Sequence, residues 1–365
     1  MSAGDDIRHM RHALRLAERS LGTAAPNPAV GCVIVSPDGR IVGRGRTQKG
    51  GRPHAETVAL EAAGVAARGA TVYVTLEPCS HHGQTPPCAD ALVSAGLKRV
   101  VVAVEDPDRR VDGRGIARLR EAGITVDVGV LKKEAADLNR GFFLRTGSER
   151  PLVTLKIAQS LDGRTASASG DSKWITGAEA RAYGHLLRAR HDAILVGIET
   201  ALADDPELTC RIPGLEARSP MRVVLDTRLR LNEWSKLAQT ARDVPTLVFT
   251  AKAPGGPLVA CGVEIVQVQR DARGRPDVTY VLKDLARRGI TRLLVEGGAS
   301  VHASFLDRGL ADRLEVFGAG IVLGGSGRAS VDALAALGLD EAPRFRRVSL
   351  KTFGTDVLES FAAPA

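Results

Sequence analysis

The sequence Thr71-Val72-Tyr73-Val74-Thr75-Leu76-Glu77-Pro78-Cys79 decides the fold of the first half of the chain. Its apolar, β-branched and aromatic residues predict a buried strand over Thr71–Leu76. Helices are predicted on both sides of this strand, over His54–Ala67 and over Ala89–Ala95. A strand between two helices indicates a layered α/β domain in which strands pair in parallel.

The same alternation extends toward both ends of the first half. Further strands are predicted over Ala29–Val35, Arg40–Gly45, Arg99–Val104 and Thr125–Val130. Further helices are predicted over Ile7–Ser20, Gly115–Ala122 and Lys132–Phe143. The polar segment Thr146–Pro151 is rich in helix-breaking residues and predicts a domain boundary. We therefore expect a first domain over residues 1–147 and a second over residues 151–365.

A second α/β series follows this boundary. Strands are predicted over Leu152–Ala158, Ala193–Gly197, Arg222–Asp226, Thr246–Thr250, Val263–Val268 and Arg292–Glu296. Helices are predicted over Ala178–Ala189 and Val281–Arg288, with one more near Val331–Leu337. The turn Glu296-Gly297-Gly298 joins a strand to a helix start, where free backbone N–H groups bind phosphate well. No glycine motif of a Rossmann dinucleotide site follows a predicted strand.

Three potential metal ligands and one acid surround the opening strand. His54 and Cys79 are separated by 24 residues, and Cys79 and Cys88 by eight. One imidazole and two thiolates leave the fourth tetrahedral position of zinc open for water, whose pKa zinc lowers to about 7. Glu56 would carry a proton from this water to the ring and the departing ammonia. This is the chemistry of zinc nucleobase deaminases.

Local geometry places these groups together. Pro53 suits the first position of a helix, so His54 and Glu56 are predicted in its first turn. Cys88 would begin the next helix, where the helix dipole favours a thiolate.

Two structural alternatives stay open for these residues. Deaminases commonly have two residues between the cysteines, whereas this sequence has eight. One alternative is therefore that the cysteines are separate core residues beside a helix-capping histidine. A structural zinc is the other alternative, with His81 or His82 as its fourth ligand.

Composition narrows the class of protein. Lys and Arg exceed Asp and Glu by 8, which fits anionic small ligands or RNA. Aromatic residues make up only 4%, which argues against a surface that stacks many bases. Five scattered cysteines do not resemble a disulfide framework. No signal peptide or apolar stretch long enough to span a bilayer is present, so a cytoplasmic protein without a membrane partner is expected.

Together the motifs resemble the bifunctional deaminase–reductases of bacterial riboflavin biosynthesis along nearly the whole chain. The motifs that carry the resemblance are Pro26–Val35, Pro53–Glu56, Tyr73–Cys88, Leu155–Lys156, Ser160–Thr165, Trp174–Thr176, Leu202–Thr209 and Glu296–Gly298. The eight-residue spacer between Cys79 and Cys88 is the pattern of this family. The resemblance implies a cytidine-deaminase-like domain followed by a dihydrofolate-reductase-like domain.

The resemblance also implies two consecutive reactions. The pyrimidine 2,5-diamino-6-(5-phosphoribosylamino)pyrimidin-4-one loses its 2-amino group as ammonia, and NADPH then reduces the ribosyl group to ribityl. His54, Cys79 and Cys88 match the ligands of one zinc ion, and Glu56 matches the proton donor. In the reductase the match implies two groups of contacts. NADPH contacts are implied for Ala158, Trp174, Thr200, Asp204 and the segment from Gly298, Ala299 and Ser300 to Ser304. Substrate contacts are implied for Ser172, Arg188, Leu208, Arg211 and Glu296.

Physical chemistry adds roles to some of these residues. Arg188 and Arg211 offer forked donors for the ribose phosphate. Lys156 could donate a proton to the sugar oxygen, or could be only a strand-edge charge. The implied partners are phosphoribosyl pyrimidines and a second copy of the chain bound through the reductase domain, without nucleic acid.

Two other functions remain as alternatives. One is a tRNA or nucleobase deaminase with an appended domain, which the basic charge favours and the low aromatic content opposes. The other is a binding or regulatory protein with a structural zinc and an inactive second domain.

Overall fold

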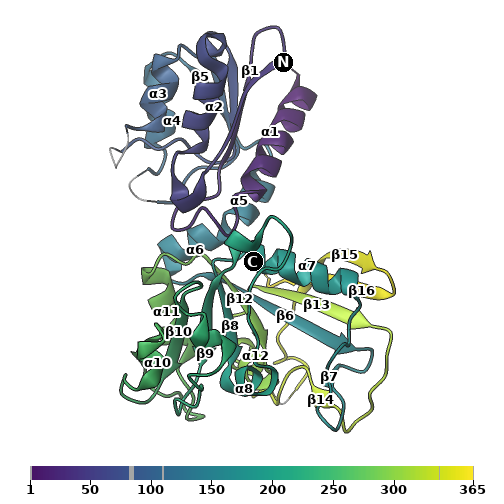
Figure 1. The fold of residues 1–365 in the computed structure, drawn as a ribbon. Helices are drawn as coiled ribbons and strands as arrows, with labels where there is room; N and C mark the ends of the chain where they lie inside the picture. The colour runs from purple at the N-terminus through teal and green to yellow at the C-terminus, as the bar shows by residue number, and fades with distance from the viewer. Residues whose placement is uncertain (1, 82–85, 109–110, 337, 365) are drawn as a thin grey trace. The chain divides into compact units, whose positions relative to one another are not determined.

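The computed structural model describes residues 2–81, 86–108, 111–336 and 338–364. The chain forms two compact units, Met1–Arg150 and Pro151–Ala365, which are described separately below (Figure 1). No helix in the described part of the chain is both long enough and apolar enough to cross a membrane.

A five-stranded sheet forms the centre of the first unit. Its spatial order is β2-β1-β3-β4-β5. The strands are β1 (Gly31–Val35), β2 (Ile41–Arg46), β3 (Thr71–Val74), β4 (Arg99–Val102) and β5 (Thr125–Val128). β3, β4 and β5 pair in parallel, as predicted, whereas β1 pairs antiparallel with both β2 and β3. Every residue of β1 and β3 is buried, which explains their continuous apolar sequences.

Helices cover both faces of this sheet and make a three-layer unit (Figure 1). α1 lies on one face, and α2, α3 and α4 lie on the other. The α-helices are α1 (Ala3–Glu18), α2 (Ala55–Ala63), α3 (Cys88–Ser94), α4 (Arg114–Glu121), α5 (Lys132–Leu138) and α6 (Arg140–Ser148). Short 3-10 helices follow β2 and α2, at Lys49–Gly51 and Gly64–Ala67.

Glycines let two of these helices lie directly on the strands. A Cβ on Gly31 of β1 would lie 1.9 Å from the carbonyl oxygen of Ala13 in α1. On the other face, a Cβ on Gly45 of β2 would lie 1.9 Å from the carbonyl oxygen of Ala55 in α2. Larger side chains would therefore push α2 away from the sheet. Because His54 and Glu56 are at the start of α2, this contact also fixes their position.

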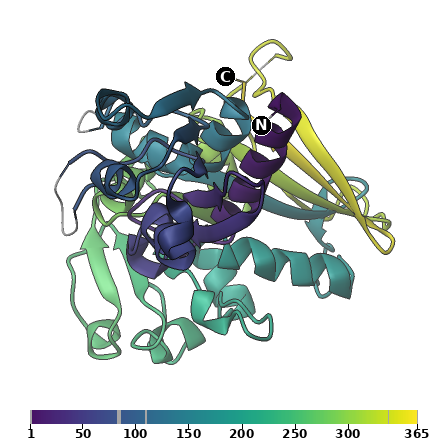
Figure 2. The same cartoon turned by 90° about the horizontal axis from the view of Figure 1, so that it is seen from above.

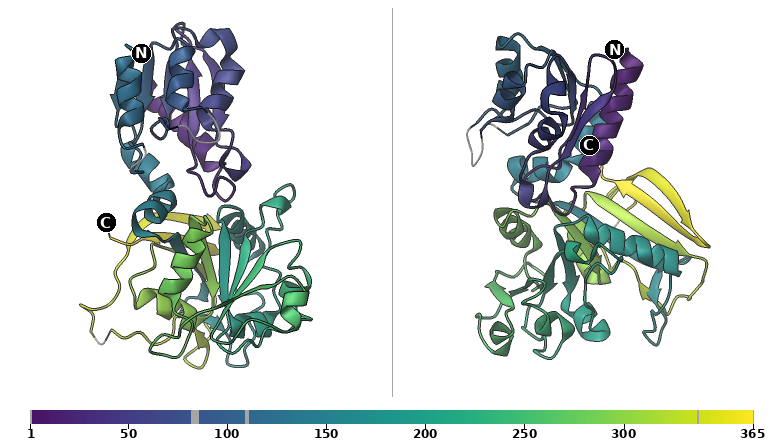
Figure 3. Two further views of the ribbon diagram at one scale, coloured as in Figure 1. Left: turned by 90° about the vertical axis from the view of Figure 1, so that its left-hand side faces the viewer. Right: turned by 45° about the horizontal axis from the view of Figure 1, so that its top comes forward.

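A nine-stranded sheet forms the centre of the second unit (Figures 1 and 3). Its order is β11-β10-β9-β8-β12-β6-β13-β16-β15. The strands are β6 (Leu152–Ser160), β8 (Ala193–Gly197), β9 (Met221–Leu225), β10 (Thr246–Thr250), β11 (Glu264–Gln267), β12 (Arg292–Gly297), β13 (Arg313–Ala319), β15 (Arg346–Phe353) and β16 (Asp356–Ala362). β11 through β13 pair in parallel, and β16 and β15 add an antiparallel hairpin at the edge (Figure 2). A separate ribbon joins β7 (Arg164–Ala166) to β14 (Arg328–Ala329).

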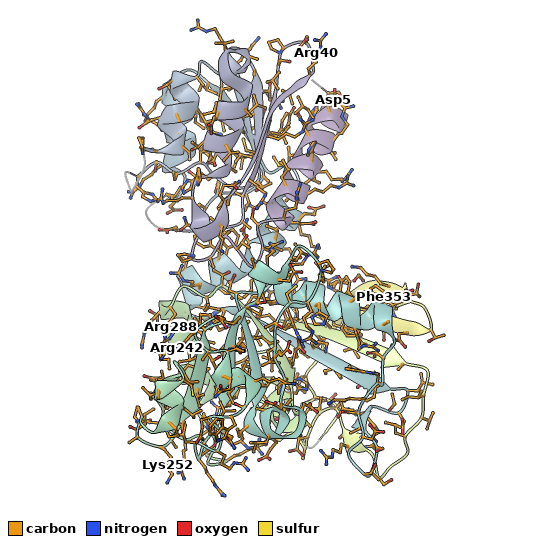
Figure 4. The ribbon with its side chains drawn as sticks, in the orientation of Figure 1. Asp5, Arg40, Arg242, Lys252, Arg288 and Phe353 are labelled. Atoms are coloured by element: carbon orange, nitrogen blue, oxygen red, sulfur yellow. The ribbon has the colours of Figure 1, made fainter. Side chains whose placement is uncertain are left out.

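Two apolar cores cover the faces of this sheet. One contains side chains of α11 (Val278–Arg287) and α12 (Ala299–Leu306). The other contains side chains of α7 (Ala178–Ala189), α8 (Ile198–Asp204), α9 (Lys236–Gln239) and α10 (Pro257–Ala260). The short 3-10 helix η3 (Glu216–Arg218) buries no residue. Phe353, labelled in Figure 4, lies against α7, where its ring centroid is 5.1 Å from that of Tyr183.

Two local predictions of helices were wrong. The helix predicted over Lys132–Phe143 is broken at Asn139, and its second part, α6, continues to Ser148. The buried Asn139 side chain exchanges two hydrogen bonds with the backbone of Ala29, which holds the break in place. No helix forms over residues 331–336, and Leu337 lies outside the described residues. There the amides of Ala333 and Ala335 donate to aspartate side chains, which compete with helical hydrogen bonds.

Candidate active sites

The three predicted metal ligands meet at one end of the first sheet. His54 is the N-cap of α2, Cys79 follows β3, and Cys88 is the first residue of α3. His54 Nδ1 lies 3.3 Å from the Cys88 sulfur and 3.7 Å from the Cys79 sulfur. All three ligand atoms lie within 4.8 Å of one another, and they are the metal-ligand cluster found in the described part of the chain.

The geometry of this cluster fits zinc. Zinc lies about 2.0–2.1 Å from an imidazole nitrogen and about 2.3 Å from a thiolate, so a tetrahedral angle places the two ligand atoms about 3.5 Å apart. The nitrogen–sulfur distances of His54 are close to that value. The structural alternative of separate core cysteines and an unrelated histidine is therefore not supported by the geometry.

One prediction about this region was wrong. Pro53 is not the first residue of the helix, because α2 begins at Ala55 and His54 is its N-cap with an extended backbone. The position still favours metal binding, because an N-cap side chain lies at the helix end rather than on a lateral face. Glu56 follows as the second helical residue, so both side chains are at the same end of α2.

Glu56 is buried beside the ligand cluster. Only 4% of the residue is exposed, and burial raises the pKa of its carboxyl to about 7, against the opposing effect of His54. A carboxyl with a pKa near neutrality can both accept and release a proton at physiological pH. Burial raises the pKa of the nearby Cys32 thiol, and the negative charge of Glu56 raises the pKa of this thiol further.

The two cysteine ligands differ in their electrostatics. The Cys79 sulfur accepts from the Cys88 backbone N–H, with a nitrogen–sulfur distance of 3.3 Å. The Cys88 thiol also faces this sulfur. Hydrogen bonding from the Cys88 thiol, with His54 also contributing, lowers the pKa of Cys79 to about 4. The same pairing raises the pKa of Cys88. Cys79 is therefore ionised to a thiolate at neutral pH, and metal binding would displace the proton of Cys88.

The neighbouring histidines do not complete a four-ligand protein site in the described chain. His81 is half-buried, and its Nδ1 has no hydrogen-bond partner among the described residues. His81 does not join the cluster of three ligands. His82 lies outside the described residues.

In the second unit, three predicted residues form one charged cluster. Arg188 of α7 donates from Nε to Glu296 Oε1 at 2.7 Å and from Nη2 to Glu296 Oε2 at 2.9 Å. Lys156 of β6 donates from Nζ to Glu296 Oε2 at 3.4 Å. β6 and β12 are neighbouring parallel strands, which explains why Lys156 and Glu296 lie side by side.

This arrangement keeps Glu296 ionised although it is buried. Burial opposes the charge, but Arg188 and Lys156 together lower the pKa of Glu296 well below its usual range. Arg188 is in turn held by Glu296 and by the carbonyl oxygen of Thr209, which accepts from Nη1 at 3.0 Å. The Lys156 side chain remains 21% exposed, so part of it is accessible to a ligand.

A loop next to this cluster carries two more predicted residues. Leu208 is buried with a left-handed backbone at φ 54°, and Arg211 is half-exposed in an ion pair with Glu207. The backbone N–H of Arg211 donates to His185 Nδ1 at 3.3 Å. His185, one turn before Arg188 in α7, thus connects this loop to the charged cluster. Burial, with Arg188 and Arg211 nearby, lowers the pKa of His185.

The strand-to-helix turn after Glu296 forms a cradle for an anion. An added Cβ on Gly298 would lie 3.4 Å from Thr200 Oγ1, which shows how closely α8 approaches the turn. Gly298 is the N-cap of α12 and provides no capping side chain. The amides of Ala299 and Ser300 have no acceptor in the described part of the protein. This cradle fits a cofactor phosphate, because free N–H groups at a helix start bind anions.

The remaining predicted residues occupy separate positions. Ala158 lies on β6, Asp204 is the last residue of α8, and Ser172 lies in the segment between β7 and α7. Trp174, in the same segment, is 68% exposed and carries the guanidinium of Arg181 4.5 Å from its ring centroid. The sequence provided no signal for two other residues: His185, and Glu77 with its four backbone donors.

Comparison with known proteins identifies both units. Residues 3–104 match the cytidine and deoxycytidylate deaminase zinc-binding region, and residues 151–358 match the RibD C-terminal domain. Relatives along the whole chain include the riboflavin biosynthesis protein RibD of Aquifex aeolicus (42% identical; 98% of each chain covered). The RibD of Escherichia coli is 40% identical over 96% of this chain and 98% of its own.

Solved structures give the same result. Acinetobacter baumannii RibD has a TM-score of 0.90 and 39% identity, with both chains fully covered. The Thermotoga maritima diaminohydroxyphosphoribosylaminopyrimidine deaminase/5-amino-6-(5-phosphoribosylamino)uracil reductase has a TM-score of 0.88 and 36% identity over 99% of each chain. The cytidine-deaminase-like and dihydrofolate-reductase-like architecture expected from the sequence is thereby confirmed.

Proposed function

From the premise that the chain belongs to the RibD family, whose members deaminate and reduce pyrimidines in riboflavin biosynthesis, we propose how its residues perform the two reactions. The first unit deaminates 2,5-diamino-6-(5-phosphoribosylamino)pyrimidin-4-one. The second unit reduces the ribosyl group of 5-amino-6-(5-phosphoribosylamino)uracil to ribityl. The observation that carries this proposal is the convergence of His54, Cys79 and Cys88 next to the buried Glu56.

In the first unit, His54, Cys79 and Cys88 would hold one zinc ion. Zinc bound there would lower the pKa of water and so supply a nucleophile at neutral pH. Glu56 accepts one proton from the attacking water and delivers it to the ring nitrogen. It then accepts the second proton, from the hydroxyl group now bonded to the ring carbon, and delivers it to the amino group, which leaves as ammonia while the carbonyl forms. Its burial supports this shuttle, because the pKa of about 7 suits both directions of transfer.

In the second unit, Lys156 is the proposed proton donor. NADPH, when bound, would supply a hydride to the first carbon of the sugar. Lys156 donates a proton to the sugar oxygen that is released from this carbon. Glu296 supports the reaction by holding the Lys156 ammonium group in place beside it.

We assign the substrate phosphate to the loop that contains Leu208 and Arg211, next to the charged cluster of Arg188, Glu296 and Lys156. Arg211 is half-exposed and can exchange its surface partner Glu207 for a phosphate. Arg188 is more restricted, because Nε and Nη2 already bind Glu296 and Nη1 binds Thr209. We therefore assign the main phosphate contact to Arg211, with Arg188 contributing only the N–H groups left free. Ser172 and Leu208 are proposed to complete the substrate site.

The cofactor is proposed to lie along the cradle. The amides of Ala299 and Ser300 would bind its phosphates, and Thr200 lies against Gly298 beside them. Ala158, Trp174 and Asp204 are proposed as further NADPH contacts. We propose NADPH rather than NADH as the reductant. The family comparison supports a reductase but does not specify its cofactor.

A second copy of the chain is the proposed partner of the reductase edge. Strand β15 is at the end of the nine-stranded sheet, so one side of its backbone is unpaired. Val348 and Leu350 both lie on this strand and are 41% and 57% exposed. We propose that this edge of the sheet forms a homo-oligomer interface. All five cysteines are free thiols, which supports a reducing cytoplasm as the location.

A coupled assay tests the proposed function. Purified full-length protein is given the diaminopyrimidine with and without NADPH, and ammonia release and NADPH oxidation are followed together. We expect ammonia without NADPH, and NADPH oxidation only after ammonia has been released. NADPH oxidation before deamination would refute the proposed order, and ammonia release from tRNA but not from the pyrimidine would favour a nucleic-acid deaminase.

A further inference from the structure

Glu77, two residues before the ligand Cys79, is a buried carboxylate with an unusual set of donors. Only 4% of the residue is exposed. Its Oε1 accepts from the backbone N–H groups of Gly115 at 2.9 Å and Ile116 at 3.2 Å. Its Oε2 accepts from the N–H groups of Gly113 at 3.0 Å and Asp106 at 3.2 Å. Four such bonds offset the free-energy cost of burying a charge.

These donors belong to the start of α4 and to the loop before it. The first amides of a helix have no partner within the helix and need an external acceptor. Gly113, the N-cap of α4, has no side chain that could serve. Glu77 therefore caps α4 from a distant part of the sequence, and its negative charge lies at the positive end of the helix dipole.

The contact extends through Pro78 to the metal ligand. An added Cβ on Gly115 would lie 2.0 Å from the carbonyl oxygen of Pro78, so α4 packs directly against this peptide. On its other side, Cys79 is held by α3. The carbonyl oxygen of Cys79 accepts from the Ala89 N–H at 3.1 Å, and its sulfur accepts from the Cys88 N–H at 3.3 Å. Cys79 is thus fixed between two helices, and Glu77 makes the connection to α4.

We propose that Glu77 is a positioning residue of the metal centre, which holds the Cys79 backbone where its sulfur can bind zinc. Glu77 is absent from the ligand cluster and acts through Pro78 and Cys79. Residues that orient a metal ligand typically change metal affinity by about 10–100-fold when they are mutated. We therefore expect faster zinc loss, by about that factor, when the carboxylate of Glu77 is replaced.

The experiment measures zinc release from the full chain. Glu77→Gln keeps the shape of the side chain but turns one oxygen into an NH2 group that faces two N–H donors. Zinc-loaded protein is mixed with excess of a chromogenic chelator, and absorbance gives the rate of zinc release. Glu77→Asp retains the charge but cannot reach both pairs of donors, so an intermediate rate is expected. Reductase activity of the same samples shows whether the second unit is folded.

Asp6 provides a matched control in the same unit. It is 8% exposed and accepts from Tyr73 Oη at 2.7 Å and from Arg99 Nη1 and Nη2 at 2.8 Å each. Asp6→Asn should lower the thermal stability of the first unit without accelerating zinc release. If Glu77→Gln and Glu77→Asp release zinc no faster than Asp6→Asn at equal thermal stability, Glu77 is only a helix cap and the proposal is wrong.

The inference depends on the proposed zinc centre, but the two can fail separately. Wild-type protein that retains no zinc would refute the zinc centre itself. Zinc that is retained by wild-type protein and lost at the same rate from the Glu77 variants would refute only the positioning role. Should Glu77→Gln fail to fold, the milder Glu77→Asp still decides between these outcomes.

Discussion

Arg188 and Glu296 form a bidentate ion pair in the interior of the reductase unit, with nitrogen–oxygen distances of 2.7 and 2.9 Å. The pair joins α7 to β12, and Lys156 of β6 shares one of the Glu296 oxygens. Because both side chains are at most 15% exposed, little solvent can reach either charge in place of its partner. The pair therefore contributes to stability and to the geometry of the proposed reductase site at the same time.

Glu296→Gln should damage both properties. It leaves two cations, Arg188 and Lys156, facing a neutral amide, and breaking a buried pair typically costs about 3–5 kcal/mol. We expect lower unfolding free energy of the reductase unit and loss of uracil reduction, with ammonia release unchanged. Urea unfolding and the two activity assays check this. Equal losses of both activities would show that the defect is global, contrary to the expectation.

Lys156→Met should separate proton donation from cofactor binding. The methionine has a similar length but no donor, so the reduction rate kcat should fall by about 10²–10⁴-fold. NADPH affinity, measured by fluorescence titration, should stay near that of the wild type. Lys283→Met, at an exposed position of α11, is the control for removal of a lysine charge. A kcat close to the wild-type value would mean that Lys156 is not the proton donor.

Removal of zinc should abolish only the first reaction. The three ligands His54, Cys79 and Cys88 all belong to the first unit. Protein treated with a chelator should release no ammonia but should still reduce the preformed uracil substrate with NADPH. Added zinc should restore ammonia release, whereas it should not do so in Cys88→Ser, which weakens one ligand. Loss of the reductase activity upon chelation is the contrary result.

Glu56→Gln should stop deamination while zinc stays bound. The amide preserves the shape of the side chain but cannot carry the proton, so the rate of ammonia release should fall by about 10²–10⁴-fold. Zinc content, measured by elemental analysis, should remain one per chain. A variant that loses zinc would instead indicate that Glu56 is a ligand.

The first site could be predicted from the sequence because its ligands follow the ends of local elements. Cys79 lies five positions after the last residue of the buried strand β3, and His54 and Cys88 are at helix starts, so the sequence order alone brings them to one end of the sheet. The error at Pro53 was small, since a shift of the helix start by two residues left His54 at its end. Strand positions in the core were also predictable, because the parallel strands are apolar on both faces.

Contacts that depend on long-range packing could not be predicted. Glu296 lies 108 positions after Arg188 in the sequence, and only the pairing of β6 with β12 brings Lys156 to them. Glu77 has no sequence pattern of its own, because all its partners are backbone N–H groups of another segment. The helix expected near Val331 failed because aspartate side chains in the folded protein take its amides.

His191 should make the reductase unit less stable in mild acid. Its Nδ1 donates to the carbonyl oxygen of Leu187 at 2.7 Å, and its Nε2 accepts from Thr154 Oγ1 at 3.0 Å. Only 2% of the residue is exposed, and burial lowers the pKa of His191 to about 3 from the ordinary 6.5. The neutral ring is therefore the form that the folded protein holds over most of the pH range.

The sign of the effect follows from proton uptake. Below about pH 6.5 the unfolded chain binds a proton at His191, whereas the folded chain binds none until about pH 3. The unfolding free energy should thus decrease as the pH is lowered across this window, by up to about 1.4 kcal/mol per pH unit from this group. His191→Asn cannot titrate, so the stability advantage of the wild type over this variant should shrink between about pH 7 and about pH 5. Urea unfolding at both pH values measures this difference, and other titrating groups cancel in the comparison. A stability difference that stays constant with pH would mean that His191 is protonated in the folded unit and that burial does not suppress its charge.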